Sequence, residues 1–104
     1  MKTTGTHDKE NSEDKPAAFY ARIRGRVQGV GFRYSTVQEA ERLKLNGWVR
    51  NSYDGDVEVW AEGSAEKLAR FIAWLRKGPQ FSRVDSVKKE DRDPKGYSDF
   101  IVEY

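Results

Sequence analysis

Apolar and polar positions alternate along residues 19–27, which read FYARIRGRV. A repeat of period two predicts a strand that buries one face and exposes the other. The apolar positions would form the core face, and arginines occupy most of the opposite one. We therefore expect the folded part of the chain to begin with a strand that is basic on its solvent side.

A helical spacing follows this strand. Apolar residues recur three positions apart, at Val37, Ala40 and Leu43. This spacing predicts a helix over residues 33–45. Candidate capping boxes at positions 35/38 or 36/39 would begin the helix, and the Asn-Gly dipeptide at 46–47 would end it.

The rest of the chain shows the same two periods. A strand at 48–51, an Asp-Gly turn at 52–55 and a strand at 57–62 form a predicted hairpin. A second helix would begin with Ser64 as its N-cap and end at the basic Gly-Pro stop signal of residues 76–79. Two further strands are expected at 84–89 and 100–104, with a polar turn at 91–96 between them.

The order of these elements is β-α-β-β-α-β, followed by a short fifth strand. It predicts an α+β fold, the ferredoxin-like sandwich, with two helices on one face of a mostly antiparallel sheet. Residues 18–104 would form this single domain. Residues 1–17 are rich in charged and polar side chains and would bury too little apolar surface to become ordered, so we expect a flexible charged N-terminal tail.

Composition excludes several classes of protein. The chain has 104 residues, no cysteine and a net charge of +2, with charges of both signs interleaved. It therefore lacks disulfides and thiolate metal sites, and it has no dense basic stripe for nucleic acid. Its N-terminus has no apolar run that could act as a signal peptide or cross a membrane. We expect a cytoplasmic monomer without nucleic-acid or membrane partners.

The most informative segment is GRVQGVGFR at residues 25–33, where the first strand enters a glycine-rich turn. Gly29 and Gly31 allow several backbone N–H groups to point at one anion, and the following helix N-terminus adds partial positive charge. Arg33 would add a permanently charged fork suited to phosphate. The alternative is a tight turn with a solvated arginine. Neither the G-x-x-x-x-G-K-[ST] nor the G-x-G-x-x-G pattern is present, which argues against ATP and NAD as ligands.

Asn51 is the second candidate site residue. A right-handed crossover would make the first two strands parallel, so the glycine turn and the end of the second strand should meet at one edge of the sheet. The Asn51 side chain offers an acceptor and a donor that can orient a water beside a bound anion. The alternative is a residue that caps the hairpin before the Asp-Gly turn.

Taken together, these segments resemble the acylphosphatase family. The resemblance rests on GRVQGVGFR at 25–33, GWVRN at 47–51 and DGDVE at 54–58, and it extends over residues 19–104. It implies the same ferredoxin-like fold. By matching position, it implies that Arg33 binds phosphate and that Asn51 orients the attacking water. The turn that would cradle the phosphate comprises Gln28, Gly29, Val30, Gly31 and Phe32.

The resemblance also implies a reaction, the hydrolysis of small acyl phosphates to a carboxylate and inorganic phosphate, with no metal or cofactor. The single histidine, His7, lies in the tail, and Asp54 and Asp56 are expected to be solvated turn residues rather than metal ligands. A carboxylate leaving group with a pKa of about 4 needs no general acid, so positioning and electrostatics would suffice. The bound phosphate would itself accept the proton of the water.

Two other functions stay open. The same sandwich occurs in RNA-recognition domains, although the strand at 57–62 is acidic and has one aromatic residue instead of a stacking motif. Acylphosphatase-like domains also begin larger hydrogenase-maturation proteins, where the role would be non-catalytic or would concern carbamoyl phosphate. A chain of one domain favours the free enzyme.

Overall fold

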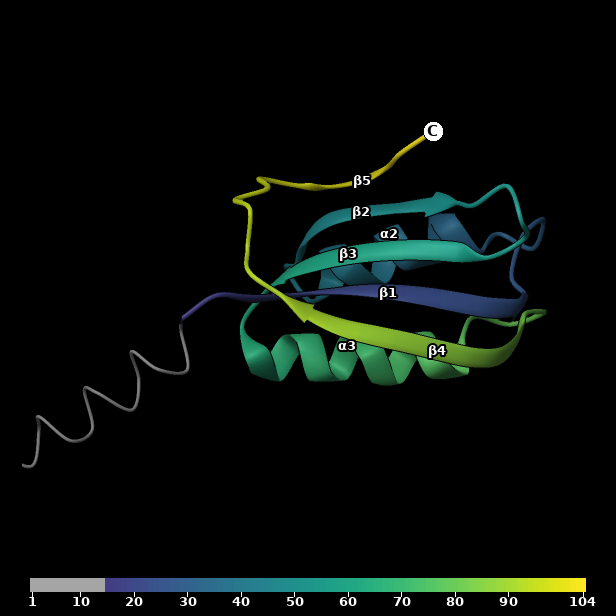
Figure 1. Ribbon diagram of the computed structural model, residues 1–104, viewed down its shortest axis with the longest axis horizontal. Coiled ribbons are helices and arrows are strands. Elements are labelled where there is room, and N and C mark those ends of the chain that lie inside the picture. Colours follow the sequence, from purple (N-terminus) through teal and green to yellow (C-terminus); the bar gives the residue numbers. More distant parts are fainter. Residues whose placement is uncertain (1–14) are drawn as a thin grey trace, which may run out of the picture.

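The computed structural model describes residues 15–104 (Figure 1). Within that range the elements follow the order expected from the sequence. The strands are β1 (Ala17–Arg26), β2 (Asn46–Asn51), β3 (Val57–Gly63), β4 (Arg83–Arg92) and β5 (Phe100–Val102), and the helices are α2 (Phe32–Arg42) and α3 (Ala65–Lys77). Of the predicted N-terminal tail, residues 1–14 lie outside the described residues, and Ala17 is the first residue of β1.

One five-stranded sheet organises the fold. Its strand order is β4-β1-β3-β2-β5, and every neighbouring pair is antiparallel except β2 and β5, which are parallel. Both helices cover the same face of this sheet (Figure 1). The predicted α+β sandwich is therefore confirmed. Because β1 and β2 both run antiparallel to β3, their C-terminal ends lie at the same end of the sheet.

The alternation in β1 divides the sheet into a core face and an open face. Phe19, Ala21 and Ile23 are buried in the core beneath the helices. In the register between β1 and β3, Ala21 lies opposite Val59, so the apolar positions of both strands fall on the same side. Phe71 of α3 completes the core, with its ring centroid 6.2 Å from that of Phe19. Burial of each such side chain stabilises the fold by about 1.5–3 kcal/mol.

The start of α2 differs from the prediction. The helix covers Phe32–Arg42 rather than 33–45, and neither predicted capping box forms, because the N-cap is Gly31 in the left-handed region with a φ of 77°. Ser35 and Thr36 lie inside the helix, where the Thr36 hydroxyl donates to the Phe32 carbonyl at 2.7 Å. The first N–H groups of α2 thus have no side-chain acceptor from a cap.

The sequence predicts that the Asn46-Gly47 dipeptide ends the first helix. In the structure this dipeptide begins β2 instead. The helix ends at Arg42, and Lys44 reverses the chain with a left-handed φ of 60°. Gly47 has a φ of 141°, and a Cβ atom there would lie 1.9 Å from the carbonyl oxygen of Trp60. Glycine is needed at this position because β2 and β3 approach closely, and not because a helix stops.

The last two strands differ in length from the prediction. β4 covers Arg83–Arg92 instead of 84–89, so the predicted turn at 91–96 begins later. As an edge strand, β4 needs no regular apolar alternation, and its pairing with β1 extends it through charged residues. β5 ends at Val102, although the Glu103 N–H still donates to the Val49 carbonyl at 2.9 Å.

Glu62 anchors the segment that connects β4 to β5. Its buried carboxylate accepts hydrogen bonds from the backbone N–H groups of Lys95, Gly96 and Tyr97 and from the Trp60 indole, at 2.5–3.0 Å. Burial is the largest single influence on the pKa of Glu62 and raises it, but these hydrogen bonds together lower the pKa below its ordinary value. The anchor brings the chain to the outer edge of β2, where β5 begins.

We expect Glu62→Gln to destabilise the fold by about 2 kcal/mol at neutral pH, because a neutral amide replaces an ionised acceptor. A carboxylate whose pKa is lowered by folding contributes stability above its unfolded pKa and loses it as the pH falls through the folded pKa. The difference in Tm between native and variant chains should therefore shrink below pH 4.5, the ordinary pKa of this group. Thermal unfolding of both chains across that pH range measures this difference. A difference in Tm that stays constant with pH would contradict the role given to the Glu62 carboxylate.

Candidate functional site

The turn between β1 and α2 presents unpaired backbone N–H groups. Gly29 and Gly31 both have a φ of 77°, a left-handed conformation that other residues rarely adopt. Among the hydrogen bonds of residues 15–104, none is donated by the backbone N–H groups of residues 28–33. The N-terminus of α2 lies at the same place, and its dipole adds partial positive charge. The turn therefore has the geometry of an anion-binding site.

Arg33 is the second residue of α2, so its side chain begins beside the turn. The residue is half-buried, and it forms no ion pair with an acidic side chain in the described part of the chain. Its guanidinium lies 5.5 Å from the centre of the Tyr104 ring, within cation–π distance. The positive charge of Arg33 is thus held in place without being neutralised.

Asn51 is the last residue of β2. Strand alternation places its side chain on the same face as Val49, toward the helices. Its Oδ1 atom is buried and has no hydrogen-bond partner within residues 15–104. A buried acceptor without a partner costs about 1–3 kcal/mol. Such an atom marks a place where a water or a ligand group would complete the structure.

Arg33 and Asn51 line the same pocket, which has a volume of about 240 Å³. The predicted meeting of the glycine turn with the end of the second strand is therefore found. Of the predicted cradle, Gly29, Gly31 and Phe32 line the pocket, whereas Gln28 and Val30 do not. The lining residues are Val27, Gly29, Gly31, Phe32, Arg33, Tyr34, Asn51, Val102 and Tyr104.

Sequence reasoning missed four of these lining residues, and the two aromatic ones matter most. Tyr34 and Tyr104 are 68% and 99% exposed, so they form the outer wall of the pocket. Tyr34 could have been found from its position next to Arg33. Tyr104 reaches the site because β5 pairs in parallel with β2 and continues toward Asn51, a long-range pairing that no local pattern indicates.

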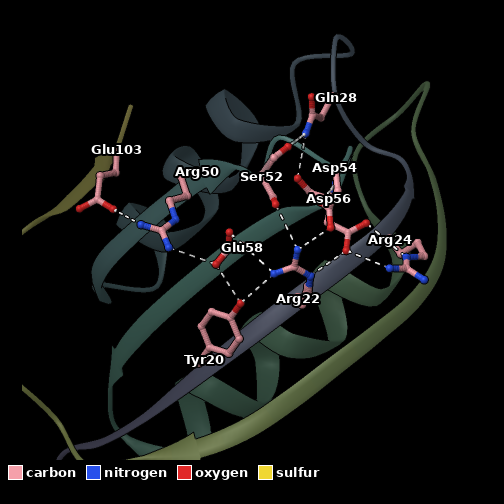
Figure 2. A network of polar contacts seen from close by, with 10 residues as sticks. All are labelled: Tyr20, Arg22, Arg24, Gln28, Arg50, Ser52, Asp54, Asp56, Glu58 and Glu103. Atoms are coloured by element: carbon pink, nitrogen blue, oxygen red, sulfur yellow. Dashed lines mark hydrogen bonds and ion pairs between the residues drawn. The ribbon is translucent and has the colours of Figure 1, made fainter.

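A polar network holds the hairpin that follows Asn51 (Figure 2). Arg22 of β1 donates to the Ser52 hydroxyl at 3.1 Å, to Asp54 at 2.8 Å and to Asp56 at 2.8 Å. The expectation that both aspartates are solvated is wrong for Asp56, which is buried and pairs also with Arg24 at 3.3 Å. The charges of these aspartates are used to fix the hairpin.

This network is ionised at neutral pH. Hydrogen bonds from the Ser52 hydroxyl, the Asp56 backbone N–H and the Arg22 side chain lower the pKa of Asp54 to about 2. Hydrogen bonds to Tyr20, Asp56 and Asp54 raise the pKa of Arg22 above its ordinary range. The ion pair between Arg22 and Asp54 is therefore fully charged at neutral pH.

The chemistry of the pocket favours an anion. Its lining residues supply a guanidinium, an amide, two phenols and free backbone N–H groups, with no acidic side chain among them. Within residues 15–104, no three His, Cys, Asp or Glu side chains lie close enough together to hold a metal ion. Across the same residues, no helix combines the length and the apolar character that crossing a membrane requires.

Comparison with known sequences agrees with this site. A family model described as Acylphosphatase matches residues 19–102. The acylphosphatase of Burkholderia lata is 50% identical over 80 residues, which cover 77% of this chain and 82% of that protein. The acylphosphatase of Burkholderia thailandensis is 47% identical over 83 residues, which cover 80% and 85% of the two chains.

Solved structures give the same result. The acylphosphatases of Coxiella burnetii and Bacillus subtilis each superpose with a TM-score of 0.82 at 39% identity, covering 85% of this chain and 93% and 99% of theirs. A full-length HypF in a phosphate- and nucleotide-bound form superposes with a TM-score of 0.79 at 29% identity over 88% of this chain, but over 12% of that one. On its sequence, its fold and the similarity of its relatives, the chain belongs to the acylphosphatase family of hydrolases.

Proposed function

We propose that the chain hydrolyses small acyl phosphates to a carboxylate and inorganic phosphate, with separate roles for Arg33 and Asn51. Arg33 and the N–H groups of residues 28–33 bind the phosphoryl group, and Asn51 orients the attacking water. The observation that carries this proposal is the buried Oδ1 atom of Asn51, which has no hydrogen-bond partner among the described residues. It lies in the same pocket as Arg33, which forms no ion pair with an acidic side chain of residues 15–104. One residue supplies fixed positive charge, and the other supplies an acceptor for a hydrogen of water.

The reaction needs few protein groups. The water oxygen attacks phosphorus while the bond from phosphorus to the acyl oxygen breaks, and the acyl group leaves as a carboxylate. A carboxylate of pKa about 4 departs without a general acid. The phosphoryl oxygens carry the charge of the transition state, which the guanidinium and the N–H groups stabilise. Because no acidic side chain or imidazole lines the pocket, the proposal assigns the proton of the water to a phosphate oxygen.

The aromatic wall of the pocket suits the acyl part of the substrate. Tyr34, Val102 and Tyr104 line the pocket together with the glycine turn, and both tyrosines are exposed. An aromatic acyl group could pack against these side chains, whereas an acetyl group would leave most of their surface uncovered. The proposal therefore includes a preference for aromatic over small aliphatic acyl groups.

Other expectations remain predictions. We propose a cytoplasmic, monomeric enzyme without nucleic-acid or membrane partners, and a turnover that requires no metal or cofactor. The support for the last point is the leaving group, which is stable enough as an anion to depart without a Lewis acid.

We expect the native chain to release phosphate from benzoyl phosphate with EDTA present, and Arg33→Ala to lower kcat/KM by at least about 100-fold. Arg33→Lys should recover little activity, because a point charge does not replace the planar fork. Inhibition by inorganic phosphate should weaken in both variants. Arg26→Ala, an exposed arginine just before the turn and outside the pocket, is the matched control. The proposal would be contradicted if EDTA abolished turnover by the native chain, or if Arg33→Ala kept the kcat/KM of the native chain.

Asn51→Ala should lower kcat by about 100-fold, since an unoriented water attacks in line less often. The inhibition constant of inorganic phosphate should change by less than about threefold, because the phosphoryl contacts remain. Asn51→Leu should also lose turnover, yet its Tm should equal or exceed the native value, since it removes a buried acceptor without a partner. If phosphate inhibition weakened as much as kcat fell, Asn51 would be a binding residue and its assigned role would be wrong.

Tyr34→Ala should raise the KM for benzoyl phosphate by about 3- to 10-fold, the range expected for loss of one aromatic contact. The KM for acetyl phosphate should change by less than about twofold, because that substrate does not reach the ring. Tyr53→Ala serves as control, since Tyr53 is fully exposed in the hairpin and does not line the pocket. Equal changes in both KM values would place the acyl group elsewhere.

A further inference from the structure

Gln28 joins the two halves of the site by its side chain. It is the first residue of the turn after Val27, yet it does not line the pocket. Its Nε2 atom donates to the Ser52 carbonyl at 2.8 Å and to the Asp56 carbonyl at 2.9 Å (Figure 2). Both hydrogens of this amide are therefore used within the protein. Ser52 directly follows Asn51 in the chain.

These two carbonyls belong to the base of the hairpin that follows Asn51. The Ser52 N–H donates to the Asp56 carbonyl at 2.8 Å, which closes the hairpin. From the other side, Arg22 holds the Ser52 hydroxyl and the Asp56 carboxylate. The base of the hairpin is thus held by a charged residue of β1 and by Gln28.

Within residues 15–104, the Gln28 amide provides the only hydrogen bonds between the turn of residues 27–31 and the hairpin of residues 52–56. Arg22 fixes the hairpin to the body of β1, but it does not reach the turn. Among the hydrogen bonds of residues 15–104, the Gln28 amide is therefore the direct link between the turn and the hairpin that follows Asn51.

We propose that Gln28 is a positioning residue, which fixes the turn against the hairpin so that the water held by Asn51 lies in line with the phosphoryl group. This inference rests on the proposed roles of Asn51 and of the turn. In-line attack is sensitive to small displacements, and an error of about 1 Å can lower the rate about 100-fold. The Gln28 side chain contacts neither the water nor the phosphoryl group and acts through the position of Asn51.

The test replaces Gln28 by methionine, which has a similar shape but no donor. We expect Gln28→Met to lower kcat by about 10- to 100-fold, because the water is no longer held in line. Inhibition by inorganic phosphate should change by less than about threefold, since Arg33 and the backbone N–H groups remain. The exposed Gln80, outside the pocket, provides the matched control Gln80→Met, for which no change is expected.

A double-mutant cycle with Asn51→Ala separates positioning from a general loss of structure. If Gln28 acts through Asn51, adding Gln28→Met to Asn51→Ala should lower kcat by less than about twofold further. An equal loss in both backgrounds, or a loss of phosphate inhibition that matches the loss of kcat, would overturn the inference.

The same measurements distinguish this inference from the proposed function. If Asn51→Ala alone kept native turnover, the role of Asn51 would fail and that of Gln28 with it. If Asn51→Ala lost turnover but Gln28→Met did not, only the inference about Gln28 would fail. Thermal unfolding of each variant shows whether it is folded. Should Gln28→Met not fold, Gln28→Asn, whose amide is too short to reach both carbonyls, is expected to show the same division between kcat and phosphate inhibition.

Discussion

The position of β3 is the constraint on which the site depends. β1 and β2 each pair antiparallel with β3, so both end at the same end of the sheet, separated by the width of that one strand. Two strand spacings place their axes about 10 Å apart, a span suited to a phosphoryl group and one water. The glycine turn after β1 and Asn51 at the end of β2 face each other across this gap. The N-terminus of α2 and the end of β5 add Arg33, Tyr34 and Val102 to this pocket.

The site keeps polar groups unpaired where the rest of the molecule pairs them. On the open face, the Glu62 carboxylate accepts four hydrogen bonds, and Arg22 binds three acceptors of the hairpin. In the pocket, the Asn51 oxygen has no partner among the described residues, and the backbone N–H groups of residues 28–33 have none. A buried acceptor without a partner costs free energy, and the Asn51 oxygen is such an atom. In the proposed mechanism a water completes the hydrogen bonding of this oxygen, and the phosphoryl group receives the N–H groups of the turn.

Local sequence was enough to locate the strands, the helices and the two segments that line the candidate pocket. The period of two in β1, the glycines of the turn and the parallel direction of β1 and β2 together predict that Arg33 and Asn51 meet. Local sequence was not enough where a tertiary contact decides the structure. The cap of α2 is a backbone conformation at Gly31, where the sequence predicted a capping box at 35/38 or 36/39. The glycine at 47 serves the approach of β3, where the sequence predicted the end of a helix. The side chain of Gln28 hydrogen-bonds to partners that are 24 or more residues away. Tyr104 reaches the pocket through the long-range pairing of β5 with β2.

Arginine shows the limit of sequence reasoning most clearly, because the same side chain has opposite uses on the two faces of the sheet. Arg22 lies among the carboxylates of Asp54, Asp56 and Glu58, and these contacts make it part of the scaffold. Arg33 lies near the Tyr104 ring and lines the same pocket as the glycine turn. Its charge therefore stays available to an anion. Composition and spacing treat the two alike. The two arginines differ in their acidic neighbours. Three carboxylates lie beside Arg22 on the open face, whereas no acidic side chain lines the pocket that contains Arg33. The proposed role of Arg33 as a ligand-binding group depends on this difference, because no acidic side chain of residues 15–104 forms an ion pair with it.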